Sequence, residues 1–188
     1  MGHRKSSLNN AKVNKQDYSI RRLMESDLDA YFSIRLESLK NAPTNFMSSY
    51  EEEERTGTPF FEGILRHAGI DNLIFGAFIK DRLVGVIGLY QENQLKAKHK
   101  CNIWGMYVQS DCRQKGIGRA LLREAIDHIK DRLKCLIANI TVESNNISAI
   151  KLYESMGFKL WGNEPKAMCW NGQYFDEYHL SLLLQDIS

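Results

Sequence analysis

Apolar side chains recur along this chain with two periods, every second position in some segments and every third or fourth in others. Alternation over 18–23 predicts a strand, and the helical spacing of apolar residues over 28–39 predicts an amphipathic helix that begins at Ser26. Two apolar runs at 73–79 and 83–90 are separated by three polar residues. We therefore expect these runs to form a tight antiparallel hairpin.

The second half of the chain alternates between the two periods. A strand pattern at 99–108, a helix pattern at 116–130 and a strand pattern at 135–142 follow one another, which predicts a parallel crossover. A further helix is expected over 146–156, and the alternating segment 158–184 is expected to close the fold as a hairpin. Strand, helix and strand in this order indicate a protein that mixes both structures in one sheet-based domain.

The two remaining segments have weaker patterns. After Pro43, the stretches 51–54 and 60–67 predict one or two short helical pieces. Residues 1–16 are polar and basic, with few apolar side chains to offset the entropy of ordering, so we expect a flexible tail. The remaining residues, 17–188, are few enough to fold around one hydrophobic core, so we expect a single domain.

Composition narrows the class of protein. The 188 residues include 25 Lys and Arg against 23 Asp and Glu, so the charge gives no indication of a nucleic acid partner. The four cysteines are widely separated, which predicts free thiols in a cytoplasmic protein and no metal site. No apolar run approaches the roughly 20 residues of a membrane span, so no membrane partner is expected.

A basic, glycine-containing segment precedes the predicted helix at 116–130. The first turn of a helix has backbone N–H groups without internal partners and a partial positive charge, and glycine lets an anion approach closely. The glycine spacing matches neither a P-loop nor a Rossmann turn. The glycines could also simply be residues of a loop that precedes a surface helix. The predicted anion site consists of Arg113, Gln114, Lys115, Gly116, Ile117, Gly118, Arg119 and Ala120.

A second motif follows the strand at 135–142. It reads N-x-x-A-x-x-L-Y-x-x-x-G-F, and its order after R-x-x-G-x-G resembles that of the GNAT superfamily of acyl-CoA N-acyltransferases. The resemblance covers about 18–184 and implies an α/β (α+β) fold with a mixed sheet of about seven strands and about four flanking helices. It also implies that the sheet splays between the strands 99–108 and 135–142. The motif residues are Asn146, Ala149, Leu152, Tyr153, Gly157 and Phe158.

The same resemblance implies acetyl-CoA as cosubstrate. The pantetheine arm would pair with the backbone of Met106, Tyr107 and Val108, and the pyrophosphate would bind the amides of 113–120. The resemblance also places Asn146 near pantetheine and Tyr153 near sulfur. Each has a structural alternative, because Asn146 could simply cap its helix and Tyr153 could belong to the core.

The implied reaction is direct attack of a neutral amine on the thioester. A lysine-like amine with a pKa of about 10.4 costs about 4.6 kcal/mol to deprotonate at neutral pH, so a base is required. Glu143 is the candidate at the end of its strand, with Glu52 or Glu53 and Asp176 or Glu177 as alternatives. Tyr153 is expected to act on the departing sulfur. The backbone N–H of Val108 or of a neighbouring residue is expected to donate a hydrogen bond to the oxyanion of the tetrahedral intermediate.

The acceptor is expected to be a primary amine of a small molecule or a peptide. Acidic residues at 51–54, Asp176 and Glu177 favour a cationic acceptor, although solvated acidic residues are common. A protein N-terminal or lysine acetyltransferase and a non-catalytic acyl-CoA-binding module are alternatives, and a homodimer is a further expectation. The pocket is expected to be aromatic, from Phe46, Tyr50, Phe60, Phe61, Trp161, Trp170, Tyr174 and Tyr178.

Overall fold

The computed structural model describes residues 18–66 and 69–184. One sheet organises the chain, with strand order β1-β2-β3-β4-β5-β7-β6. Every neighbouring pair is antiparallel except β4 and β5, which are parallel as the crossover pattern predicted. The strands are β1 Ser19–Arg22, β2 Asn72–Ile79, β3 Arg82–Gln91, β4 Lys100–Val108, β5 Ile137–Glu143, β6 Lys159–Trp170 and β7 Gln173–Leu183.

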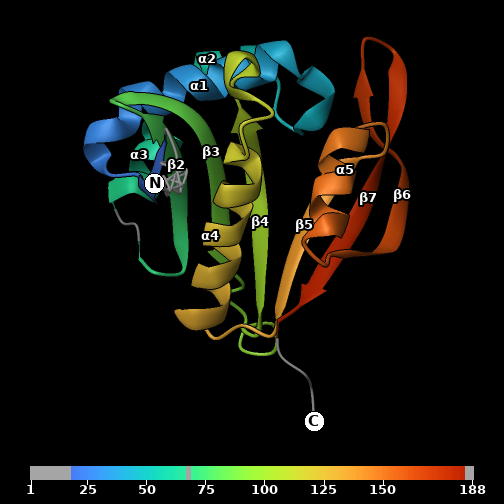
Figure 1. Ribbon diagram of the computed structural model, residues 1–188. Coiled ribbons are helices and arrows are strands. Elements are labelled where there is room, and N and C mark those ends of the chain that lie inside the picture. Colours follow the sequence, from blue (N-terminus) through green and yellow to red (C-terminus); the bar gives the residue numbers. More distant parts are fainter. Residues whose placement is uncertain (1–17, 67–68, 185–188) are drawn as a thin grey trace, which may run out of the picture.

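Helices cover both faces of the sheet (Figure 1). The apolar side chains of α1 and α3 pack on one face of β2 and β3, and those of α4 pack on the other face. Tyr153 of α5 belongs to the same core cluster as the apolar side chains of α4. Burial on both faces explains why β2 and β3 read as continuous apolar runs. The helices are α1 Leu28–Asn41, α2 Tyr50–Thr56, α3 Pro59–Arg66, α4 Ile117–Asp131 and α5 Ile147–Ser155, with short 3-10 turns at Glu25–Asp27, Pro43–Asn45 and Ser110–Cys112.

The two central strands separate along their length. Parallel pairing of β4 with β5 runs only from Lys100 opposite Ile137 to Ile103 opposite Ile140. Beyond this point β4 carries a bulge, because Gly88 of β3 lies opposite Trp104 whereas Val86 lies opposite Tyr107. Figure 1 shows the two strands side by side at one end and apart at the other. The predicted splay between these strands is therefore confirmed.

Most predicted elements are present, with shifted ends. The first helix is an exception: Ser26 lies in a 3-10 turn, and α1 begins two residues later, at Leu28. The turn forms because the Asp27 carboxylate accepts from the Met24 N–H at 2.8 Å, so Asp27 rather than Ser26 satisfies the backbone here. The fifth helix arises because Gly57, at φ 72°, ends α2 and separates it from α3. The predicted tail 1–16 lies outside the described residues.

Candidate active site

The N-terminus of α4 presents unpaired backbone donors. Gly116 is its N-cap and provides no side chain, and no acidic residue occupies the first turn. Among the described residues, the N–H groups of Ile117, Gly118 and Arg119 have no hydrogen-bond partner. A 15-residue helix with a free first turn fits a pyrophosphate group. The predicted anion site thus lies at a helix N-terminus with unpaired backbone donors, and anion binding there stays a prediction.

Gly118, in the first turn of α4, lies close to side chains of both β4 and α5. A Cβ atom at this position would lie 3.2 Å from the Met106 methyl group and 3.6 Å from Leu152 Cδ2. The absence of a side chain therefore keeps the first turn of α4 accessible next to Met106 of β4.

We expect Gly118→Val to weaken acetyl-CoA binding roughly 10- to 100-fold, the value of one or two lost charge-assisted hydrogen bonds. Isothermal titration calorimetry with CoA measures this change. Gly63→Ala is the matched control, because a Cβ atom there meets nothing within 4 Å. Equal affinity of the Gly118 variant and the wild type would show that the anion does not bind this turn.

The basic side chains of this segment donate hydrogen bonds to nearby groups of the protein. Arg113 Nε donates to the Val108 carbonyl at 3.0 Å, and Lys115 Nζ donates to the Asp111 carbonyl at 3.1 Å. Arg119 donates to Ser155 Oγ at 2.7 Å, at the end of α5. Backbone carbonyls and a hydroxyl within reach accept from these three donors. Gln114 and Ala120 complete the segment, and Gln114 adopts φ 62° just before Gly116.

The edge of β4 that faces β5 is free of strand pairing beyond Ile103. Met106, Tyr107 and Val108 lie on this stretch, as the predicted pairing with pantetheine requires. The Tyr107 side chain points to the α1 side, where its hydroxyl donates to Glu37 Oε1 at 3.0 Å, and burial raises the pKa of this tyrosine. This contact fixes β4 against α1 and leaves its β5 edge open.

Asn146 and Tyr153 both take the structural roles that were the alternatives for them. Asn146 Oδ1 accepts from the Ala149 N–H at 3.2 Å and so caps α5. Tyr153 is 5% exposed within the main core, and its hydroxyl donates to Met106 Sδ at 3.8 Å. Burial raises the pKa of Tyr153, which keeps the phenol protonated at neutral pH. Because Met106 lies on the free edge of β4, Tyr153 also reaches the expected path of the thioester arm.

A pocket lies at the carboxyl end of β5, between the segment after α1 and the β6–β7 hairpin. Glu143 is buried in its wall: Oε1 accepts from the Asn145 N–H at 2.9 Å and from Asn145 Nδ2 at 2.8 Å. Within the described residues, Oε2 has no hydrogen-bond partner and is available to a molecule in the pocket. The lining residues are Thr44, Asn45, Phe46, Met47, Glu143, Ala167, Met168, Phe175, Asp176 and Glu177.

Three carboxylates form a row across three strands beside this pocket. Glu177 of β7 is paired with Glu143 of β5 on one side and with Glu164 of β6 on the other. Paired residues on antiparallel strands share one face, so all three point to the same side of the sheet. His179 lies on that face too, with its Nε2 3.3 Å from Glu164 Oε2. Ligand atoms of Glu164, Glu177 and His179 all lie within 4.8 Å of one another.

Glu52, Glu53 and Asp176, three of the other predicted bases, have structural partners. Glu52 Oε2 accepts from the Ser49 N–H at 3.0 Å and so completes the N-terminal cap of α2. Glu53 forms an ion pair with Arg35. Asp176 lines the pocket, but its Oδ1 accepts from the Lys166 N–H at 2.8 Å. Glu143 and Glu177 both line the pocket, and Glu143, at the end of β5, is the more buried of the two.

The lining of this pocket differs from the aromatic acceptor pocket that the sequence predicts. Of the eight aromatic residues, Phe46 alone lines the pocket. Phe61 is buried under α1 in edge contact with Tyr31, and Trp161 packs on His179 at the edge strand. Phe175 and Met168 were missed. Only the register of β6 on β7 brings Met168 opposite Phe175, and no sequence signal fixes that register across a bulge.

Comparisons with known proteins agree with this geometry. A family model described as "Acetyltransferase (GNAT) family" matches residues 29–158, which span both motifs. This chain belongs to the GNAT acetyltransferase family. It is an acyl-CoA-dependent N-acetyltransferase that uses acetyl-CoA as cosubstrate.

Relatives of this GNAT enzyme differ in their acceptors. An L-amino acid N-acetyltransferase, AaaT of Escherichia coli, is 29% identical over 64% of this chain and 72% of its own length. A spermine/spermidine N(1)-acetyltransferase of Bacillus subtilis is 30% identical over 46% of this chain and 59% of its own. The structure of YncA from Salmonella typhimurium with its cofactor acetyl-CoA superposes with a TM-score of 0.77, at 19% identity over 91% of this chain and 96% of the other.

Proposed function

We propose that this enzyme acetylates a small polyamine or diamine, an acceptor with a second ammonium group near the reacting amine. The observation that carries the proposal is the row of Glu143, Glu177 and Glu164 beside the pocket. Neighbouring strands lie about 4.8 Å apart, so unscreened like charges in such a row disfavour the sheet. A ligand that brings positive charge to the row relieves this repulsion.

The spacing of the row matches such an acceptor. Three or four methylene groups, with bonds of about 1.5 Å, place two ammonium groups about 5 to 6 Å apart. This separation is close to one strand spacing. With the reacting amine at Glu143, the second ammonium group reaches Glu177, and a third charge reaches Glu164 and His179. The spermine/spermidine relative supports an acceptor of this class.

The proposed reaction passes through a ternary complex. Glu143 Oε2 accepts a proton from the ammonium group, and the amine nitrogen then attacks the carbonyl carbon of the thioester. A backbone N–H of the free β4 edge, at or beside Val108, stabilises the oxyanion. As the carbon–sulfur bond breaks, its electron pair stays on sulfur, and the Tyr153 hydroxyl donates a hydrogen bond to the resulting CoA thiolate. The second proton of the attacking nitrogen passes through solvent to this thiolate, which leaves the amide and free CoA thiol as products.

An L-amino acid is the second candidate acceptor, from the AaaT relative. Its carboxylate would meet the carboxylate row, and the pocket lining contains no cationic side chain among the described residues. The same charge argument disfavours a peptide amine unless its neighbouring residues are basic. The polyamine assignment therefore accounts better for the charges at this site.

Two further properties belong to this proposal. No helix in the described part of the chain is long and apolar enough to cross a membrane. The described cysteines are all unpaired, with Cys101, Cys112 and Cys135 buried, which supports action in the reducing cytoplasm. Association into a homodimer stays a prediction.

We expect Glu177→Gln to raise the KM for a 1,3- or 1,4-diamine roughly 10-fold and to leave the KM for a monoamine within about 2-fold, because only the diamine loses a charge-assisted contact. Acetyl-CoA turnover, followed by thiol release with both acceptors, measures this split. Glu51→Gln is the matched control, since Glu51 is an exposed glutamate of α2 outside the pocket. The assay includes EDTA, because Glu164, Glu177 and His179 are also of residue types that bind metals. Equal changes for both acceptors would exclude a second-ammonium site at Glu177.

A further inference from the structure

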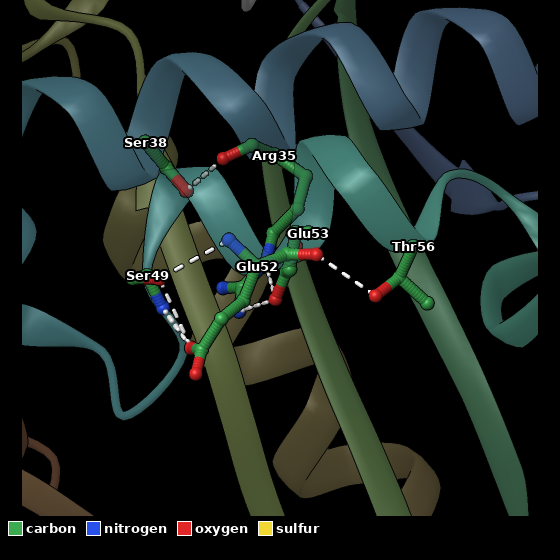
Figure 2. A network of polar contacts seen from close by, with 6 residues as sticks. All are labelled: Arg35, Ser38, Ser49, Glu52, Glu53 and Thr56. Carbon is green, nitrogen blue, oxygen red and sulfur yellow. Dashed lines mark hydrogen bonds and ion pairs between the residues drawn. The ribbon is translucent and has the colours of Figure 1, made fainter.

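A buried ion pair connects the first two helices. Arg35 of α1 holds Glu53 of α2 with both Nε and Nη2, at 2.9 Å to Oε2 and 2.6 Å to Oε1 (Figure 2). Their side chains are only 8% and 13% exposed. Such a two-pronged contact fixes the plane of the guanidinium group as well as its position.

The ends of the short helix α2 are held independently of this pair. Ser49 and Glu52 form the N-terminal cap, and Thr56 Oγ1 donates to the Glu52 carbonyl at 2.8 Å (Figure 2). Ser38 Oγ likewise donates to the Arg35 carbonyl at 2.7 Å within α1. Because the backbone around both partners is already hydrogen-bonded, the side-chain pair is not needed to satisfy it.

The fixed guanidinium faces the wall of the pocket. Arg35 Cζ lies 4.8 Å from the centre of the Phe46 ring, and Phe46 lines the pocket together with Glu143. Phe46, Met47 and Ser48 make no backbone hydrogen bond within the described residues. The position of this wall therefore depends on side-chain contacts, and the contact of Arg35 with the ring face is a directional one.

We propose that Arg35, oriented by Glu53, is a positioning residue that sets acceptor affinity by holding Phe46 in the pocket wall. The inference rests on the proposed function, because it takes this pocket as the acceptor site. A purely stabilising role is the alternative. Replacement of a buried ion pair by apolar side chains of similar size is often neutral or favourable for stability, so the pair is weak evidence for that role.

The test compares acceptor kinetics, donor binding and stability in Arg35→Met, Glu53→Gln and the conservative Arg35→Lys. We expect Arg35→Met to raise the acceptor KM about 10-fold, the size of a partly desolvated cation–π contact. Its kcat and its CoA affinity by calorimetry should change less than about 2-fold, since among the described residues the hydrogen bonds of the Arg35 side chain go to Glu53 and not to Glu143 or α4. The acceptor KM of Arg35→Lys should lie between those of Arg35→Met and the wild type, because lysine retains the charge but cannot form the two-pronged contact with Glu53.

A double-mutant cycle with Phe46→Leu separates positioning from stability. If Arg35 acts through Phe46, the loss in acceptor affinity in Phe46→Leu should not increase further when Arg35→Met is added. The inference would be overturned if the effects of Phe46→Leu and Arg35→Met on the acceptor KM multiplied in the double variant. An unchanged acceptor KM in Arg35→Met would also overturn it. Should Arg35→Met fail to fold, Glu53→Gln and Arg35→Lys are measured in the same cycle and judged by the same criterion.

Failure of the proposed function gives a different result. In that case Phe46→Leu and Glu177→Gln would themselves leave acceptor kinetics unchanged, and the pocket would not be the acceptor site. An effect of Phe46→Leu with none from any Arg35 or Glu53 variant would leave the pocket assignment standing and overturn only the positioning role.

Discussion

Glu143→Gln is expected to lower kcat/KM for the amine by about 10²- to 10⁴-fold at neutral pH, the range of general base catalysis. The substitution keeps the shape of the side chain and an oxygen that can still accept both hydrogen bonds from Asn145. What it removes is the proton-accepting power of Oε2. The loss should therefore appear in the chemical step rather than in folding or in CoA binding.

The pH profile distinguishes a lost base from a disturbed pocket. As the pH approaches the acceptor pKa of about 10.4, more of the amine is already neutral, so the deficit of the glutamine variant should shrink. Thiol release measured between pH 7 and 10 provides the profile, and Glu51→Gln on the exposed face of α2 serves as control. A deficit of constant size across this range would mean that Glu143 does not accept the proton.

Tyr153→Phe is expected to lower kcat by about 10²-fold, the low end of general acid effects. A phenol is already a weaker acid than a thiol, and burial raises the pKa of Tyr153 further. Full proton transfer to the departing thiolate is therefore unfavourable, and the hydroxyl acts as a hydrogen-bond donor to sulfur. Its contact with Met106 Sδ at 3.8 Å is with a weak acceptor that CoA sulfur can replace.

The same contact predicts a small effect on stability. Phenylalanine keeps the ring and its packing against Phe158, so the melting temperature should change little. Single-turnover kinetics, with enzyme in excess over acetyl-CoA and saturating amine, reports the chemical step. Tyr90→Phe, on the exposed end of β3, is the matched control. Turnover at the wild-type rate in Tyr153→Phe would assign Tyr153 to the core alone.

The order of the elements followed from periodicity because each period is a local property of the chain. The alternation of β6 and β7 and the helical stripe of α4 depend on side chains close in sequence, as does the N-cap at Asn146. The two motifs also lie within single loops and helix ends. For this reason the sequence could name individual candidate residues for the donor side of the site, and their binding of CoA stays a prediction.

The acceptor side could not be predicted in the same way, because its residues come together through register and side-chain pairing. Glu164 and Glu177 become neighbours only once β6 and β7 pair around two register shifts. Glu53 appeared as one of four similar glutamates, and nothing in the sequence shows that it alone reaches Arg35. The glutamate run was expected to act by charge, whereas the structure uses two of its members to cap and anchor α2.

The most direct test of the account is a competition for acetyl-CoA. The wild-type enzyme is given equal concentrations of spermidine, a monoamine of similar length and an L-amino acid, and the acetylated products are quantified by mass spectrometry. The carboxylate row of Glu143, Glu177 and Glu164 predicts that acetylated spermidine predominates over both other products by at least about 10-fold. Predominance of the acetylated amino acid would contradict the assignment of the pocket to a polycationic acceptor.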